Sequence, residues 1–287
     1  MMNIQIVIII LLILSFVFCY LFFSRKDFII VSLTTSPRRI KLMKPVIDSI
    51  LNQTYPPDLI RINIPKIFGR SGEKFDKIPN FLLNNPKIEI VEYDHDYGPI
   101  MKFLPTFYDY KDKDNINIIY TDDDVLMLPK TIEVFMRNVK SDTNKIYCFS
   151  GFKFNFTSKE FDWNWDIKNF GNVDVVEGYM SVCLSKDVLK KLNQGIELKD
   201  YHSFVSQNKY CFTSDDLLLS NYYTMKNIEK VKIFDVNVNM NKWWSSGCEL
   251  SYGKDGDGIQ HLYPNQHFLS YKNALKFLNE HKLMFFI

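Results

Sequence analysis

The chain has 287 residues, of which 46% are hydrophobic and 24% are charged, and its formal net charge at pH 7 is +2. This length and composition favour one large globular domain or two small ones and exclude a largely disordered chain. A charge so near balance lacks the strong basic excess of a nucleic-acid-binding protein, so we expect no nucleic-acid partner.

The first predicted element is an apolar helix over residues 4–23, which contains few polar side chains. Such a helix is about 30 Å long, which matches the hydrocarbon thickness of a bilayer. A cleaved signal peptide is the alternative, but no basic residue precedes the apolar segment and no small-residue cleavage site follows it. We therefore expect residues 1–25 to form a single-pass membrane anchor.

Four short stretches after the anchor predict strands, over residues 28–33, 59–64, 88–91 and 116–120, of which the first and the last are expected to be buried. Helical spacing or composition predicts helices between and after them, near Ile47, over residues 101–108 and over residues 131–139. Strands that alternate with helices indicate an α/β fold with a parallel sheet and right-handed crossovers. In such sheets, ligands bind at the carboxyl ends of the strands.

The second half of the chain is less regular. It holds an aromatic stretch over residues 152–170 and an apolar run over residues 173–184. We expect helices near residues 187–192 and after Ser214, followed by a loop-rich tail. No internal repeat or low-complexity linker divides the chain, so we expect residues 26–287 to form one domain.

The five cysteines are far apart and show no Cys-x-x-Cys spacing, which argues against a zinc site. They are Cys19, Cys148, Cys183, Cys211 and Cys248. Two disulfides are an alternative, but a chain of this length can build a core without them. We expect buried free thiols.

Three adjacent acids, Asp122, Asp123 and Asp124, follow the predicted strand at residues 116–120. We call them the acidic triplet. Adjacent carboxylates after an apolar strand are costly unless a cation or hydrogen-bond donors compensate them. Asp122 and Asp124 share one face of an extended segment, and their oxygens suit Mg²⁺ or Mn²⁺. A metal there could bridge the phosphates of a nucleotide-sugar. The alternative is a solvated loop that caps the next helix.

Four short blocks carry a resemblance to a known family. They are residues 31–39 (VSLTTSPRR), residues 51–58 (LNQTYPPD), residues 96–99 (DYGP) with Lys102, and residues 119–124 (IYTDDD). In this order they resemble glycosyltransferases with the GT-A fold that occur in bacteria, algae and large DNA viruses. The resemblance covers roughly residues 29–222 and implies a GT-A-type, Rossmann-like single domain, with a mixed, mostly parallel sheet flanked by helices.

The resemblance also implies a donor site. The residues that it places at the nucleotide-sugar are Thr34, Thr35, Ser36, Arg39, Asp96, Lys102, Asp122, Asp123, Glu177 and Gly178. Asp124 would be the direct metal ligand, and Asp122 would contact the ribose, or the metal through water. Asp94 is a rival to Asp96 near the base. The third metal ligand would be a downstream histidine, and His261 is our choice over His267.

The resemblance implies an acceptor site as well. Asp215 and Asp216, which we call the acidic pair, stand at the predicted start of a helix and resemble the acids of many inverting GT-A enzymes. Asp216, or as a second choice Asp215, would deprotonate the acceptor hydroxyl. The alternative is ordinary helix capping, which favours the same residue types. Glu177 and Gly178 resemble the loop that meets the donor sugar and acceptor, and a simple turn is the alternative.

We therefore expect a metal-dependent, inverting hexosyl- or deoxyhexosyltransferase. Its donor half is about 26–150 and its acceptor half is about 151–287. It would use Mn²⁺ or Mg²⁺ and a nucleotide-diphosphate-sugar, with a UDP-sugar preferred, and a hydroxyl of a glycan, protein or lipid as acceptor. The alternatives are a nucleotidyltransferase acting on sugar phosphates and a non-catalytic, membrane-anchored carbohydrate-binding protein.

The sequence does not determine on which side of the membrane the domain lies. Arg25 and Lys26 follow the apolar segment, and the positive-inside rule would then leave the domain in the cytosol. Most anchored glycosyltransferases of the secretory pathway have lumenal domains instead. Two glycosylation sequons, at Asn52 and Asn155, fit that location but arise by chance in an Asn-rich chain.

Overall fold

The computed structural model describes residue 15 and residues 27–156, 163–166, 170–235 and 266–286. Apart from Ser15, the predicted anchor lies outside these residues. Within the part of the chain that is described, no helix is both long and apolar enough to cross a bilayer. The anchor therefore stays a prediction.

Among the described residues, eight strands form one sheet in the order β3-β2-β1-β4-β10-β5-β11-β8. They are β1 (Phe28–Thr34), β2 (Leu59–Pro65), β3 (Ile88–Tyr93), β4 (Ile116–Tyr120), β5 (Ile146–Cys148), β8 (Gly171–Asn172), β10 (Val182–Leu184) and β11 (Lys230–Lys232). β1 pairs in parallel with β2 and β4, β2 with β3, and β5 with β11. β10 runs antiparallel between β4 and β5, and β8 runs antiparallel to β11. The expected α/β class with a mixed, mostly parallel, Rossmann-like sheet is confirmed.

The central strands are buried on both faces, which explains their continuous apolar sequences. In β1, Ile30 packs into the core on one face of the sheet, and Ile29 and Val31 pack into the core on the other. In β4, Ile118 and Ile119 divide in the same way. Because successive side chains of a strand point to opposite faces, an apolar run fills two cores at once.

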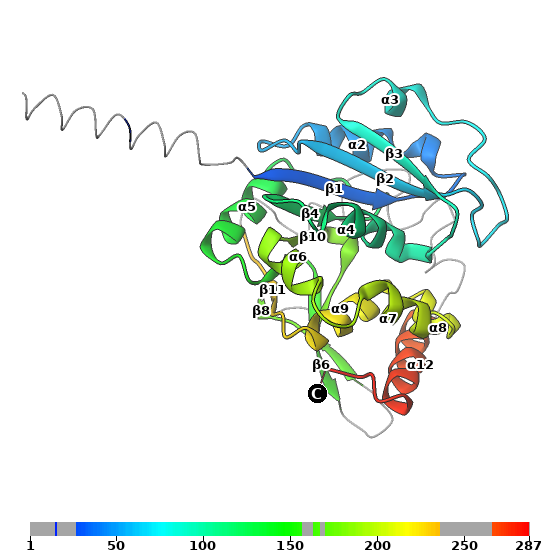
Figure 1. Ribbon diagram of the computed structural model, residues 1–287, viewed down its shortest axis with the longest axis vertical. Helices are drawn as coiled ribbons and strands as arrows, with labels where there is room; N and C mark the ends of the chain where they lie inside the picture. The colour runs from blue at the N-terminus through cyan, green and yellow to red at the C-terminus, as the bar shows by residue number, and fades with distance from the viewer. Residues whose placement is uncertain (1–14, 16–26, 157–162, 167–169, 236–265, 287) are drawn as a thin grey trace, which may run out of the picture.

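Helices cover both faces of the sheet (Figure 1). Those that carry core residues are α2 (Lys44–Leu51), α4 (Leu104–Tyr110), α5 (Thr131–Ser141), α6 (Lys186–Leu192), α7 (Leu198–Val205), α8 (Lys209–Phe212), α9 (Asp215–Met225) and α12 (Gln266–Glu280). α2 and α5 contribute to one core, and α4, α6, α7, α8, α9 and α12 contribute to the other. A short helix, α3 (Asn80–Leu83), precedes β3, and a small sheet of β6 (Gly151–Phe156), β7 (Trp163–Asp166) and β9 (Val175–Val176) lies beside the large one.

The helices differ from the expected ones in two places. The helix expected over residues 101–108 is divided into a 3₁₀ helix, η2 (Gly98–Lys102), and α4, because Pro105 near the start of α4 has no N–H to continue an earlier helix. The tail is not entirely loop, since α12 spans 15 residues. Its buried side chains recur at helical spacing, which the sequence does contain. They are Tyr271, Ala274, Leu275 and Leu278.

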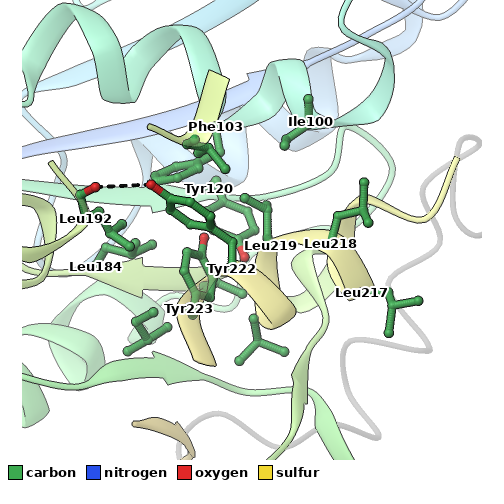
Figure 2. Packing of buried hydrophobic residues seen from close by; sticks show 14 of the residues in the cluster. Ile100, Phe103, Tyr120, Leu184, Leu192, Leu217, Leu218, Leu219, Tyr222 and Tyr223 are labelled. Atoms are coloured by element: carbon green, nitrogen blue, oxygen red, sulfur yellow. Dashed lines mark hydrogen bonds between the residues drawn. The ribbon is translucent and has the colours of Figure 1, made fainter. Parts of the chain in front are cut away.

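Helix α9 is held in place by the core beneath it (Figure 2). Tyr222 and Tyr223 are fully buried near Phe103 and Tyr120, and the Tyr223 and Phe103 rings meet edge to face at 6.4 Å. The Tyr222 hydroxyl donates to the carbonyl oxygen of Leu192 at 3.2 Å. The second half of α9 is therefore packed against the core that β4 shares.

The expected free thiols are confirmed where they can be examined. Cys148, Cys183 and Cys211 are buried and form no disulfide. Burial raises the pKa of the Cys211 thiol to about 12, which makes it chemically inert. Cys19 and Cys248 lie outside the described residues.

Candidate active site

The acidic triplet lies at the carboxyl end of β4, at the centre of the large sheet. Thr121 continues the pairing of β4 with β1, because its N–H donates to the Ser32 carbonyl oxygen at 3.1 Å. The next three residues leave the sheet and diverge, so that Asp122 pairs with Lys102 while Asp123 and Asp124 share Arg39. The predicted position of the triplet at the carboxyl end of this strand is thus confirmed.

Asp123 turns inward and is the most buried member of the triplet. Its Oδ1 lies 2.7 Å from Nη1 of Arg39, and its Oδ2 accepts a hydrogen bond of 2.6 Å from the Thr35 hydroxyl. The same guanidinium reaches Asp124, with Nη2 3.0 Å from Oδ2. Arg39 is itself buried. This arrangement fixes the triplet against the turn that follows β1.

Asp122 turns the other way and contacts Lys102, the last residue of η2. Its Oδ1 lies 2.6 Å from the Lys102 ammonium. The same ammonium lies 2.8 Å from Oδ2 of Asp215 and 3.7 Å from Oδ1 of Asp216. Acids that are more than 90 residues apart in the sequence therefore meet at one buried lysine.

The acidic pair does more than cap α9. Ser214, at the N-cap position, makes no side-chain hydrogen bond to the helix. Asp215 and Asp216 occupy the first turn, where the helix dipole favours negative charge. Both are largely buried and directed at Lys102, whereas capping acids are ordinarily exposed to solvent.

Gly178 follows β9 and packs directly on this cluster. Its N–H donates to Oδ1 of Asp216 at 2.9 Å. A Cβ at this position would lie 2.7 Å from the Lys102 ammonium, so no larger residue fits without displacing it. Three residues later, buried Ser181 adopts a φ of 72°, which is strained for a residue with a side chain, and its hydroxyl donates to the Thr121 hydroxyl at 3.1 Å.

Glu177 forms a second polar cluster beside Gly178. Its Oε2 accepts a hydrogen bond of 2.5 Å from Ser150, and the Ser150 and Tyr179 hydroxyl oxygens are 3.1 Å apart. Burial raises the pKa of Glu177 against the opposing effect of Ser150. Two carboxylates therefore lie at the loop over residues 177–179. Glu177 belongs to the loop, and Asp216 accepts a hydrogen bond from its Gly178 N–H.

The described residues of the site include more acidic than basic side chains. In the described part of the chain, the five carboxylates of the acidic triplet and acidic pair face the two cations of Lys102 and Arg39. Burial, together with the charges of Asp123 and Asp122, raises the pKa of Asp124 to about 7. Burial and the neighbouring acids also raise the pKa of Asp216 well above its ordinary value. Burial would lower the pKa of Lys102, but its three acidic neighbours outweigh burial and raise it.

This excess of negative charge fits a divalent cation. Mg²⁺ and similar ions are commonly held by one or two carboxylates together with the phosphates of a substrate. Asp122 and Asp124 can supply those two carboxylates. Among the described residues, no group of three or more His, Cys, Asp and Glu side chains is arranged to hold a metal. His261, the predicted third ligand, lies outside them, as does most of the tail around it.

No protein-family model matches this chain, and no curated protein sequence matches it. The chemistry of the site therefore has to be inferred from its own residues and their geometry.

The polar residues at the end of β1 and in the turn after it make different contacts. Thr34 donates its hydroxyl hydrogen bond to the Asn63 carbonyl oxygen at 2.7 Å, and Thr35 binds Asp123. The carbonyl oxygen of Ser36 accepts from the N–H groups of Arg39 and Ile40, both at 3.1 Å. These contacts shape the turn at the edge of the sheet. Contact of the three side chains with a nucleotide stays a prediction.

Asp96 links two loops by accepting hydrogen bonds from a backbone N–H group of each. Its Oδ2 accepts from the Gly69 N–H at 2.6 Å, and its Oδ1 accepts from the Gly98 N–H at 2.8 Å. Asp94, the alternative candidate for contact with the base, is exposed and pairs with Lys66. Asp96 thus has both oxygens engaged by backbone groups, and its predicted role at a base or ribose remains untested.

Sequence reasoning missed Thr121, Ser150, Tyr179 and Ser181. Thr121 belongs to the block at residues 119–124 and Tyr179 follows Glu177 and Gly178, but these uncharged residues were given no role. Composition and spacing give no sign of Ser150 and Ser181. Ser150 follows a strand of only three residues, β5, which the sequence analysis did not find. The strain at Ser181 depends on its φ, which only a structure reveals.

The raised pKa of Asp124 gives the protein a pH dependence with a definite sign. Its pKa is about 7 in the folded state and about 3.9 when unfolded. Between these values the folded state binds the extra proton, so rising pH destabilises it. In EDTA, the stability of Asp124→Asn relative to the unaltered protein should increase by on the order of 2–4 kcal/mol from pH 4 to pH 7.5.

Urea unfolding at several pH values measures this difference. Titrating groups that do not interact with Asp124 cancel, because both proteins contain them; His202, whose pKa burial lowers to about 4, is one such group. A difference in stability that stays constant with pH would contradict the assignment.

Proposed function

We propose that this protein is a metal-dependent, inverting glycosyltransferase of the GT-A type. It would transfer a sugar from a nucleotide-diphosphate-sugar, with a UDP-sugar preferred, to a hydroxyl of a glycan, protein or lipid. The single observation that carries the proposal is the meeting of Asp122, from the acidic triplet, with the acidic pair at Lys102, at the carboxyl edge of a mostly parallel sheet.

The donor side of the proposed site is formed by the ends of β1 and β4. Asp122 and Asp124 would hold the Mn²⁺ or Mg²⁺ ion, whose charge would stabilise the departing nucleoside diphosphate. The turn after β1, which Arg39 and Thr35 tie to Asp123, would receive the nucleotide. The negative charge of the site supports this assignment, because it needs a cation to become favourable.

The acceptor side is formed by the first turn of α9 and the loop at Gly178. Asp216 would remove the proton from the acceptor hydroxyl, whose oxygen attacks the anomeric carbon. The bond from that carbon to the phosphate oxygen breaks, and its electron pair leaves with the nucleoside diphosphate. A carboxylate with a raised pKa suits this task, since a general base works best when its pKa is near the working pH.

Asp215 is less suited to act as the base. It lies closer to Lys102 than Asp216 does, at 2.8 Å against 3.7 Å, so its charge is more fully committed to the ion pair. Asp216 instead accepts one backbone N–H, from Gly178. We assign Asp215 to holding the lysine.

The proposed anchor is compatible with this site. β1 begins at Phe28, at the edge of the sheet opposite the site, and runs toward the site for seven residues. A membrane helix that precedes β1 would therefore leave the catalytic edge facing away from the bilayer and open to donor and acceptor.

The proposal predicts metal-dependent nucleotide binding. Purified protein should bind UDP in the presence of Mn²⁺ and bind it at least about tenfold more weakly in EDTA, because the cation bridges phosphate and carboxylates. Titration calorimetry measures both affinities, with GDP and CDP as alternative ligands. If no nucleoside diphosphate binds in a metal-dependent manner, the proposed function is wrong.

A second prediction concerns the base. Asp216→Asn should lower sugar transfer by at least about 100-fold, since a positioned general base contributes roughly 10²–10⁴ in rate. Its Mn²⁺-dependent affinity for UDP should change less than about threefold. A screen of UDP-sugars with simple glycoside acceptors gives the rates, and normal turnover by this variant would rule out Asp216 as the base.

A further inference from the structure

We infer that Lys102 is an internal counter-ion and positioning residue, which competes with the divalent cation for Asp122 while it holds the acidic pair in place. This inference rests on the proposed function. It differs from the role that the resemblance implies, in which the same lysine would contact the phosphates or sugar of the donor.

The surroundings of the ammonium leave little access for a donor. The Lys102 side chain is 3% exposed, and it has short contacts to Asp122 and Asp215 at 2.6 and 2.8 Å. Gly178 covers it so closely that even a methyl group there would lie 2.7 Å from the ammonium nitrogen. An ammonium has three N–H donors, and three carboxylates already surround this one.

The two carboxylates proposed to bind the metal have different cationic partners. Asp124 is paired with Arg39, and Asp122 with Lys102. A divalent cation that binds Asp122 must approach a carboxylate that is already in contact with the positive charge of the lysine. The lysine and the metal are both positive, so each weakens the binding of the other.

The same lysine sets the geometry of the acceptor side. Its contact with Asp215 ties the first turn of α9 to η2, and Asp216 is then directed to the Gly178 N–H. Without the ammonium, the carboxylates of the acidic pair and Asp122 repel one another across the site. Asp216 should then lose its position even though the metal ligands remain.

The decisive variant is Lys102→Met, which keeps the unbranched shape and most of the length of the side chain and removes its charge. We expect it to bind Mn²⁺ alone on the order of tenfold more tightly than the unaltered protein. Its affinity for UDP in saturating Mn²⁺ should stay within about threefold, while sugar transfer falls by at least about 100-fold. Lys66→Met, which removes an exposed lysine paired with Asp94, is the matched control and should change none of these values.

Lys102→Met could also fail to fold, because it leaves buried carboxylates without a counter-ion. The double variant Lys102→Met/Asp215→Asn removes one charge of each sign, and its reference is Asp215→Asn alone. The double variant should show the same gain in Mn²⁺ affinity over that reference.

Calorimetry with MnCl₂ and with UDP separates the outcomes. A gain in Mn²⁺ affinity with UDP affinity retained supports the inference. Unchanged or weaker Mn²⁺ binding, together with at least a tenfold loss of UDP affinity, would show that Lys102 contacts the donor and would overturn it. If the unaltered protein itself binds neither Mn²⁺ nor UDP, the proposed function fails, and this inference fails with it.

Discussion

The contact of one buried ammonium with three carboxylates is the constraint on which the rest of the site depends. A buried charge is tolerated only when opposite charges and hydrogen bonds compensate its lost hydration. Lys102 obtains that compensation from Asp122 after β4 and from the acidic pair at the start of α9. Removing one member of such a group typically costs about 3–5 kcal/mol, so the three segments are fixed relative to one another.

The surrounding structure can be understood as support for this contact. The Lys102 ammonium occupies the space that a side chain at position 178 would need, and glycine leaves this space free. Ser181 adopts a strained backbone conformation that links the same loop to Thr121. Such strain costs on the order of 1–3 kcal/mol and is found mostly at functional sites. The site therefore combines uncompensated negative charge with local strain, and both are more easily explained by ligand binding than by stability.

Much of the fold could be predicted because its central strands are buried on both faces. Runs rich in isoleucine and other apolar residues located β1, β2, β3 and β4, and the acidic triplet marked the end of β4. The short strands β5, β10 and β11, each of three residues, carry too little periodic signal to be found. The antiparallel insertion of β10 between β4 and β5 is a long-range pairing that local sequence does not specify. The residues of the site were largely foreseen, but their partners were not. Arg39 and Lys102 were expected near a diphosphate, whereas the structure pairs them with the acids of the site.

The central claim is that the acidic triplet binds a divalent cation together with a nucleoside diphosphate. Anomalous diffraction from crystals grown with MnCl₂ and UDP tests it most directly, because the manganese signal locates the ion independently of any assumed role. The account predicts a single strong peak within about 2.5 Å of carboxylate oxygens of Asp122 or Asp124 and of the UDP phosphates. A nucleotide-bound crystal with no peak at the triplet, or with the manganese bound by other residues, would contradict it.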